Sequence, residues 1–217
     1  QVRRKVEAAT NSLARTFDRI VGLLTERGFI ADTAADGDPK VTDDGRMLAR
    51  IYSESDLLVA ECLRTGAWQG LKPPELAAVV SAVLYETRGA DGPGGPPTLQ
   101  APTEAVRRAL HQTRKLSAAL RADERRHGIN PTREPADGFV AAVYRWARSG
   151  DLASGLAASD AAGGGTPLLA GDFVRWCRQV LDLLDQLRNA APNAELRATA
   201  KQAIDTVLRG VVAVDAG

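Results

Sequence analysis

The sequence predicts an all-α protein, a helical bundle accompanied by one small β-hairpin. Alanine and leucine are abundant, whereas aromatic residues make up only 5% of the 217-residue chain, and this composition favours helices over sheets. Apolar residues recur every three or four positions through most long segments, which is the helical period. With 44% hydrophobic residues at this length, the chain can bury a substantial core.

The first segment, residues 3–27, is predicted to be a helix that ends at Gly28. Its apolar side carries residues at helical spacing, namely Leu13, Phe17, Ile20, Val21 and Leu24. Residues 29–31 and 40–42 then offer two short strands around an Asp-Gly-Asp-Pro turn, which predicts a weak hairpin.

A helix followed by a two-stranded wing is typical of the closing half of a winged-helix unit. We therefore expect residues 1–44 to end a winged-helix domain and residues 45–217 to form the helical bundle. The first two helices of the winged-helix unit would lie upstream of Gln1, and the absence of an initiating methionine suggests a piece of a longer protein.

Two further helices are predicted in the middle of the chain. Ser53 to Asp56 resembles a capping box before a helix that continues to Arg64 and stops at Gly66. Pro73-Pro74-Glu75 begins the next helix, because proline is tolerated in a first turn. The buried face of this helix is expected to carry Leu76, Val79, Val80, Val83 and Leu84.

Glu86 is expected in the last turn of that helix, where a carboxylate opposes the helix dipole. Two explanations stay open. Either the carboxylate has a function, or Arg88 or an arginine from another helix neutralises it.

A loop rich in glycine and proline, residues 89–102, precedes a long helix from Thr103 to about His127. The outer face of this helix carries a basic stripe of Arg107, His111, Arg114, Arg121 and Arg125. A solvated face is the default interpretation of such a stripe, and phosphate contact is the alternative.

The last third of the chain predicts four more helices. Asp137 is expected to cap a helix through Arg148, and a short helix, 152–158, comes before a triple-glycine loop. The order of short helix, loop and arginine-bearing helix resembles a helix-turn-helix with an overlong turn. A final helix, 194–212, is expected to close the bundle.

The segment 171–188 has the most regular apolar stripe of the chain. Its buried face is expected to hold Phe173, Cys177, Val180, Leu181, Leu184 and Leu187, and its other side Arg175, Arg178, Gln179, Asp182 and Gln186. Two arginines three residues apart near a helix N-terminus can present paired donors to an oxyanion. The alternative is a solvated face, since most surface arginines contact only water and neighbouring carboxylates.

Several classes of function are disfavoured. The net charge of +1 gives no global field toward a polyanion, so a nucleic-acid role must depend on a local patch. No lysine follows a glycine as in a P-loop, and the two histidines belong to no catalytic or metal-ligand pattern. We therefore expect no catalytic, metal or cofactor residues, so that the chain alone is not an enzyme.

The two cysteines, Cys62 and Cys177, lie on apolar helix faces and are predicted to be buried thiols. There is neither a run of about 18 apolar residues nor a signal-peptide pattern. A cytoplasmic protein without membrane contact is expected.

The order of segments resembles a known family. The run VTDDGRMLARIYSESDLLVAECLRTGAWQGLKPPELAAVVSAVLYETR, a long helix, GFVAAVYRWARSGDL and then GDFVRWCRQVLDLLDQL are similar to the DSHCT domain. This domain ends the exosome-associated superfamily 2 DExH-box RNA helicases and their actinobacterial HelY-like branch. The resemblance covers residues 41 to about 214.

The resemblance implies a ratchet-type helical bundle that packs on the helicase motor domains and lines the channel for single-stranded RNA. Carried over by position, the residues that contact nucleic acid are Glu86, Arg175 and Arg178. Gln179 stands where the eukaryotic pattern has an arginine, so Arg178 would supply the charge from the adjacent position. ATP and Mg²⁺ would bind the motor domains outside this chain, and RNA-degradation machinery is a further expected partner.

Two other functions remain as alternatives. The chain could be a helical protein-interaction scaffold that packs on motor domains or a partner without contacting nucleic acid. It could also be a winged-helix DNA-binding regulator that uses residues 15–42. This last interpretation ranks lowest, because the net charge is nearly balanced and the wing carries Asp32, Asp36 and Asp38.

Overall fold

The computed structural model describes residues 2–31, 40–86, 100–162 and 168–214, and its fold is all-α as predicted. The described elements are α1 Val2–Glu26, β1 Ile30–Ala31, β2 Lys40–Val41, α2 Asp43–Leu48, α3 Asp56–Thr65, α4 Pro73–Ala82, α5 Glu104–Arg126, the 3₁₀ turn η1 Asp137–Phe139, α6 Val140–Ser149, α7 Leu152–Ala162, α8 Ala170–Ala190, α9 Ala194–Val207 and α10 Gly210–Ala213.

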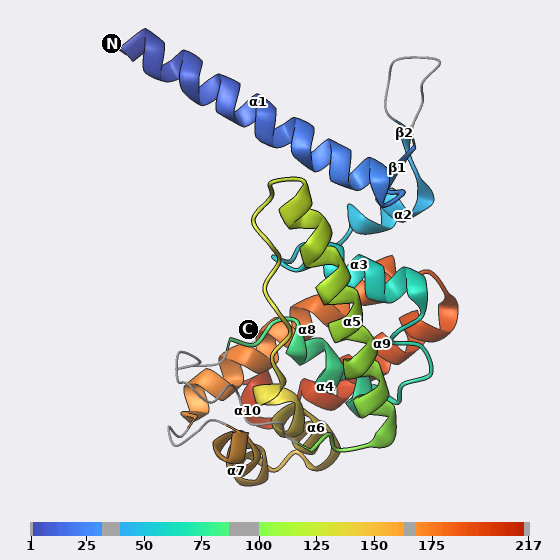
Figure 1. Ribbon diagram of the computed structural model, residues 1–217. Helices are drawn as coiled ribbons and strands as arrows, with labels where there is room; N and C mark the ends of the chain where they lie inside the picture. The colour runs from blue at the N-terminus through green and yellow to red at the C-terminus, as the bar shows by residue number, and fades with distance from the viewer. Residues whose placement is uncertain (1, 32–39, 87–99, 163–167, 215–217) are drawn as a thin grey trace.

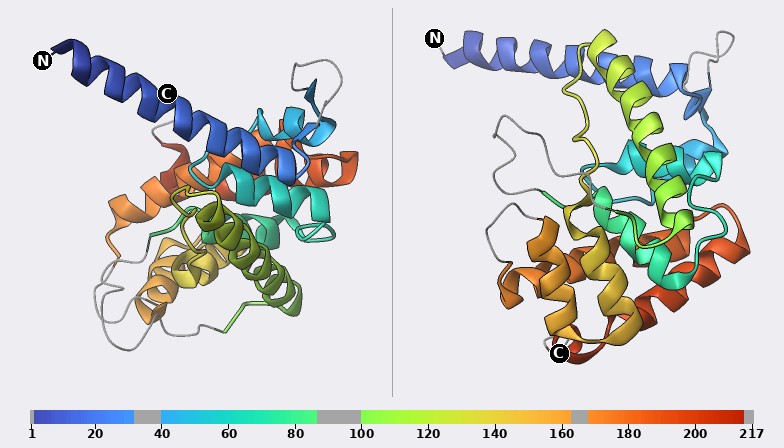
Figure 2. Two further views of the ribbon diagram at one scale, coloured as in Figure 1. Left: turned by 45° about the horizontal axis from the view of Figure 1, so that its top comes forward. Right: turned by 60° about the horizontal axis from the view of Figure 1, so that its bottom comes forward.

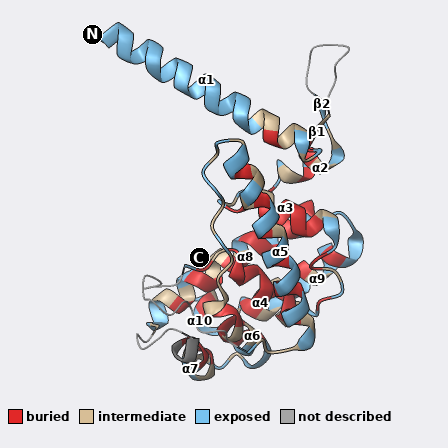
Figure 3. Cartoon of the chain, in the orientation of Figure 1, coloured by how far each residue is buried: buried red, intermediate tan, exposed pale blue. Residues whose placement is uncertain are grey.

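Helix α4 lies at the centre of the bundle, and α5, α6, α8 and α9 pack around it (Figure 1). Every residue from Glu75 to Ala82 is buried. A helix that is apolar on all sides is stable only when other elements cover it completely. The buried residues concentrate accordingly in α3, α4, α6 and α8 (Figure 3).

Helix α1 projects from the bundle instead of packing into it (Figures 1 and 2). Among its described residues only Leu23 is buried, whereas Leu13 is 72% and Phe17 66% exposed. The periodicity therefore identified the apolar stripe of this helix, but no part of the described chain covers the half that contains Leu13 and Phe17.

The predicted hairpin is confirmed as an antiparallel pair in which Ile30 faces Val41. Residues 32–39, including the three aspartates of the expected wing, lie outside the described part of the chain. Thr42 caps α2 and its hydroxyl also donates to the carbonyl of Gly28, so the hairpin is joined directly to the following helix. Helix α2 spans the expected domain boundary at residue 44.

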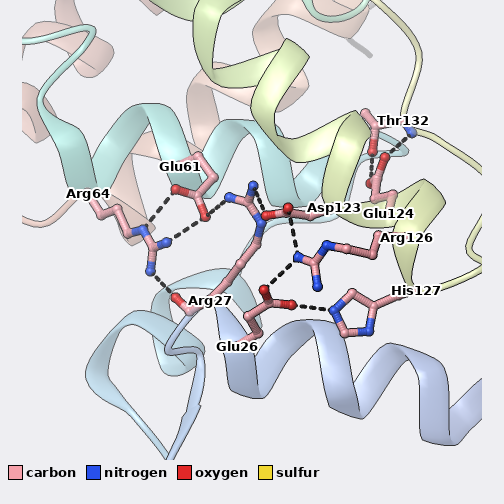
Figure 4. Close-up of polar contacts among 9 residues, drawn as sticks. All are labelled: Glu26, Arg27, Glu61, Arg64, Asp123, Glu124, Arg126, His127 and Thr132. Atoms are coloured by element: carbon pink, nitrogen blue, oxygen red, sulfur yellow. Dashed lines mark hydrogen bonds and ion pairs between the residues drawn. The ribbon is translucent and has the colours of Figure 1, made fainter.

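A network of ion pairs fastens the end of α1 to α3 and α5 (Figure 4). Arg27 donates to Glu61 on α3 at 3.0 Å and to Asp123 on α5 at 2.8 Å. Glu26 contacts both Arg126 and His127 at the end of α5. Few apolar contacts join α1 to the bundle, so these polar contacts hold its direction.

Several predicted helix ends were wrong. One is the start of α3, which the predicted capping box placed too early. The helix begins at Asp56, three residues after Ser53, and its N-cap residue is Ser55. The Ser53 hydroxyl accepts from the Ser55 N–H and so stabilises a turn before the helix. The predicted stop at Gly66 is confirmed, because this residue has the left-handed conformation (φ 75°) that favours glycine.

Helix α4 is shorter than predicted. It ends at Ala82, so Glu86 lies in the segment after the helix and not in its last turn. Asp137 begins a 3₁₀ turn before α6 instead of capping one continuous helix. Each difference falls at an element end, where periodicity carries the least information.

The closing helix is interrupted near its end. Helix α9 stops at Val207, and Gly210 (φ 49°) starts the short α10. The break leaves Leu208 42% exposed. The short helix after Gly150 runs longer than predicted, to Ala162. The triple-glycine loop and residues 89–99 lie outside the described residues.

Across the described ranges, no helix is both long and apolar enough to cross a membrane.

Candidate nucleic-acid interface

A polar depression of about 430 Å³ lies beside the middle of α8. Three other segments complete it, one before α3, one after α4 and one between α5 and η1. Its lining consists of Tyr52, Ser53, Glu54, Leu84, Glu86, Arg133, Arg175, Trp176, Gln179, Asp182, Leu183 and Gln186. Residues far apart in the sequence thus meet at one surface.

The polar side of α8 supplies one wall of the depression. Arg175, Gln179, Asp182 and Gln186 recur at helical spacing and therefore share one face. On the opposite side, the predicted stripe is buried at Phe173, Cys177, Val180, Leu184 and Leu187, and Leu181 is half-buried. Burial of the apolar stripe fixes the rotation of the helix and so determines which polar residues reach the depression.

Aromatic packing supports the floor. The Trp176 side chain lines the depression yet is only 8% exposed. Its ring lies edge-on to Tyr85, with 5.0 Å between centroids, and Tyr85 stacks on Phe139 at 5.5 Å. Interlocked rings of this kind leave the wall little freedom to collapse.

Glu86 reaches the depression from the segment after α4 and forms an ion pair with Arg133. Arg133 also donates to the carbonyl of Leu84 at 3.0 Å, so the pair is tied to the backbone. The expectation that an arginine neutralises Glu86 is thus met, although Arg133 comes from the segment between α5 and η1 and not from a helix. Arg88, the other expected partner, lies outside the described residues.

Arg175 lines the depression from the N-terminal part of α8, and its side chain is 56% exposed. One of its terminal nitrogens is 3.4 Å from an Asp172 carboxylate oxygen, and its guanidinium carbon is 5.2 Å from the centre of the Trp176 ring. These two contacts hold the side chain in place. A guanidinium has five N–H donors, so further donors are available to a ligand.

The structure brings together three of the four residues expected to contact nucleic acid. Glu86, Arg175 and Gln179 all line the depression. Arg178 does not line it and is half-buried. The position next to Gln179 on the helix therefore points away from the hollow, and Gln179 itself presents its amide there.

Sequence reasoning missed Tyr52 and Arg133, which both line the depression from loops. Gln186, which was predicted only to lie on the polar side of α8, holds the backbone of Tyr52. Its amide accepts from the Tyr52 N–H at 2.7 Å and donates to the Tyr52 carbonyl at 3.3 Å. Loop residues have no periodicity, so no sequence signal could have assigned them to this site.

The basic stripe of α5 is largely paired within the chain. Arg107 forms an ion pair with Glu104 at 2.7 Å, and Arg114 pairs with Asp137. Arg121 lies 3.3 Å from Glu134. The stripe therefore offers less free positive charge than its sequence suggests.

The described residues contain no group of three histidine, cysteine or acidic side chains that could hold a metal ion. The prediction that both cysteines are buried thiols is confirmed. Burial raises the pKa of Cys62 to about 12 and also raises the pKa of Cys177. Neither thiol has the low pKa of a nucleophile.

Comparison with known proteins decides the family. The sequence profile of the DSHCT (NUC185) domain matches residues 38–215. The chain belongs to the DSHCT domain family. The resemblance found in the sequence is thereby confirmed, and it extends over most of the chain.

The mycobacterial relatives of this DSHCT chain are helicases by name. It is 75% identical to "Probable helicase HelY" of Mycobacterium leprae over all 217 residues, which make up 23% of that protein. It is 73% identical to the protein of the same name in Mycobacterium tuberculosis, again over its whole length and 24% of the relative. It is 31% identical over 150 residues to human "Superkiller complex protein 2", covering 66% of this chain and 11% of that protein. The chain thus spans about a quarter of the length of its mycobacterial relatives.

Proposed function

We propose that this chain is the C-terminal accessory domain of an ATP-dependent RNA helicase, and that single-stranded RNA passes over the depression beside α8. The observation that carries the proposal is the meeting of Glu86, Arg175 and Gln179 in one polar hollow, although they come from separate segments. The similarity of the whole chain to proteins named as helicases supports the assignment.

The charge of the lining favours contacts with bases over contacts with phosphates. Three carboxylates, Glu54, Glu86 and Asp182, face two guanidiniums, Arg133 and Arg175. A track for the phosphate backbone needs an excess of positive charge, which this hollow lacks. Neutral base edges carry both donors and acceptors, and so does the lining.

The mechanism that follows is non-covalent. The groups on α8 are fixed on a rigid helix, and each makes a weak contact with a passing base. Base contacts worth about 1–3 kcal/mol each would oppose backward slipping between steps without trapping the strand. The domain would in this way assist the direction of unwinding.

The remaining parts of the helicase lie outside this chain in our proposal. Motor domains that bind ATP and Mg²⁺ pack against the bundle, and residues 1–44 end a preceding winged-helix domain. The protein acts in the cytoplasm and works with RNA-degradation machinery.

The test is a double variant, Arg175→Ala with Gln179→Ala, in the full-length helicase. We expect it to lower the unwinding rate of a duplex with a single-stranded RNA overhang about fivefold or more, and to lower RNA-stimulated ATP hydrolysis much less. Arg188→Ala is the matched control, because Arg188 lies on the same helix, outside the depression, and pairs with Asp185 at 2.5 Å. Equal loss of both activities, or loss of neither, contradicts the proposal.

The exposed stripe of α1 favours a second candidate, a protein-interaction scaffold. Exposed apolar residues at helical spacing are typical of surfaces that another protein or domain covers. If Leu13→Ser with Phe17→Ser abolishes unwinding while the α8 double variant leaves it unchanged, the scaffold is the better account.

A further inference from the structure

We infer that Tyr52 is a stacking platform for a base of the single strand at the rim of the depression, an inference that rests on the proposed function. Tyr52 is 79% exposed, the highest value among the large apolar and aromatic residues that the structure describes. It nevertheless lines the same hollow as Arg175 and Gln179. An aromatic ring left in water beside a polar hollow is available to a ligand with a flat apolar face.

The backbone under the ring is held from both sides. Gln186 of α8 contacts the N–H and the carbonyl of Tyr52 at 2.7 and 3.3 Å. The preceding residue, Ile51, is 4% exposed and so anchors the chain in the core. Past Tyr52, Ser55 is buried and its hydroxyl donates to the Val83 carbonyl at 3.2 Å.

A held backbone leaves the ring only its own two torsions to lose when a ligand binds. The entropic cost of ordering a tyrosine is therefore small compared with that of a long flexible side chain. The arrangement suits a contact that must form and break repeatedly as a strand moves.

The surroundings of the ring favour a nucleobase over a protein side chain. A docked protein would bring apolar groups against apolar neighbours. The lining residues shown to neighbour Tyr52 are instead polar: Ser53 and Glu54 follow it in the chain, and Gln186 bonds its backbone. A base combines an apolar face, which can stack on the ring, with a polar edge, which can reach the donors and acceptors of α8.

Stacking is tolerant of sequence, because every base has a π-face. We therefore expect Tyr52 to contribute to binding without selecting a base. The Glu86, Arg175 and Gln179 groups would contact the edges of the same or the next base.

The experiment uses the full-length helicase and single-stranded RNA that carries one 2-aminopurine, a base whose fluorescence falls when it stacks. We expect binding to quench this fluorescence at one or two positions along the RNA. Tyr52→Leu is expected to abolish the quenching and weaken RNA binding about fivefold or more, whereas Tyr52→Phe keeps both. Leucine retains apolar bulk, so the pair of variants separates stacking from simple apolar contact.

Tyr144→Leu provides the control, since Tyr144 is a half-buried tyrosine of α6 beside Arg148 that lines a different hollow. It is expected to leave the quenching unchanged. If Tyr52→Leu keeps full quenching while Arg175→Ala weakens binding, the stacking role is wrong and the proposed function stands. If neither Tyr52→Leu nor Arg175→Ala changes RNA binding, both are wrong.

Discussion

Arg27 and Glu61 form an ion pair with almost no access to solvent. A terminal nitrogen of Arg27 lies 3.0 Å from a carboxylate oxygen of Glu61, and the two side chains are only 11% and 4% exposed. Arg27 directly follows α1, and Glu61 lies in the middle of α3. The pair therefore joins the projecting helix to the bundle that carries the depression.

We predict that Arg27→Ala lowers the free energy of unfolding of the chain by about 1–3 kcal/mol, because it removes two charge-assisted hydrogen bonds from a nearly buried site. The loss stays in this range because Arg64 still donates to Glu61 at 2.6 Å. Urea unfolding followed by circular dichroism measures the change. Arg188→Ala, which breaks an exposed pair, is expected to change stability by less than about 0.5 kcal/mol. Equal effects of the two variants would contradict the structural role of Arg27.

A second prediction concerns pH. The Arg126 guanidinium, with Arg27, lowers the pKa of Asp123, and Arg126 with His127 lowers that of Glu26. A carboxyl whose pKa is lower in the folded state stabilises the fold above its ordinary pKa, and this contribution is lost as the pH falls. Wild-type protein should therefore have a higher Tm than Asp123→Asn at pH 7, and the difference should shrink below about pH 4. A difference that stays constant down to pH 3 would mean that the carboxylate charge does not stabilise the fold.

The cysteines give a third prediction. Cys62 is fully buried and its pKa is raised to about 12, and Cys177 is equally buried. The thiolate is the reactive form, and its fraction at pH 8 is very small in the native protein. Neither thiol should react with iodoacetamide at pH 8 within an hour, while both should react in 6 M guanidinium chloride, as mass spectrometry can measure. Rapid labelling of the native chain would show that the helix faces carrying these thiols open to solvent.

The fold could be predicted largely from sequence, because burial imposes periodicity. The stripe that includes Phe173, Cys177 and Val180 gave both the existence of α8 and the face it buries. The hairpin was predicted from a different signal, the residues of its turn. Helix ends were less accurate, since the side chain of Ser53 can cap a turn as well as a helix.

The candidate site could be predicted only in part. Glu86, Arg175 and Gln179 were identified through resemblance and helix geometry, and they do meet. Arg178 was expected beside them, but the rotation that buries α8 turns it away from the hollow. Tyr52 and Arg133 belong to loops, and only tertiary structure brings them to the site.

Photo-crosslinking tests the central claim, that a single strand contacts the depression, most directly. Full-length helicase would be stalled on RNA containing 4-thiouridine with a non-hydrolysable ATP analogue, irradiated, digested and mapped by mass spectrometry. Our account predicts crosslinks in the peptides that carry Tyr52 and residues 175–186 of α8, and their loss in the Arg175→Ala, Gln179→Ala variant. Crosslinks confined to other surfaces, such as the outer face of α5 or the α1 stripe, would contradict it.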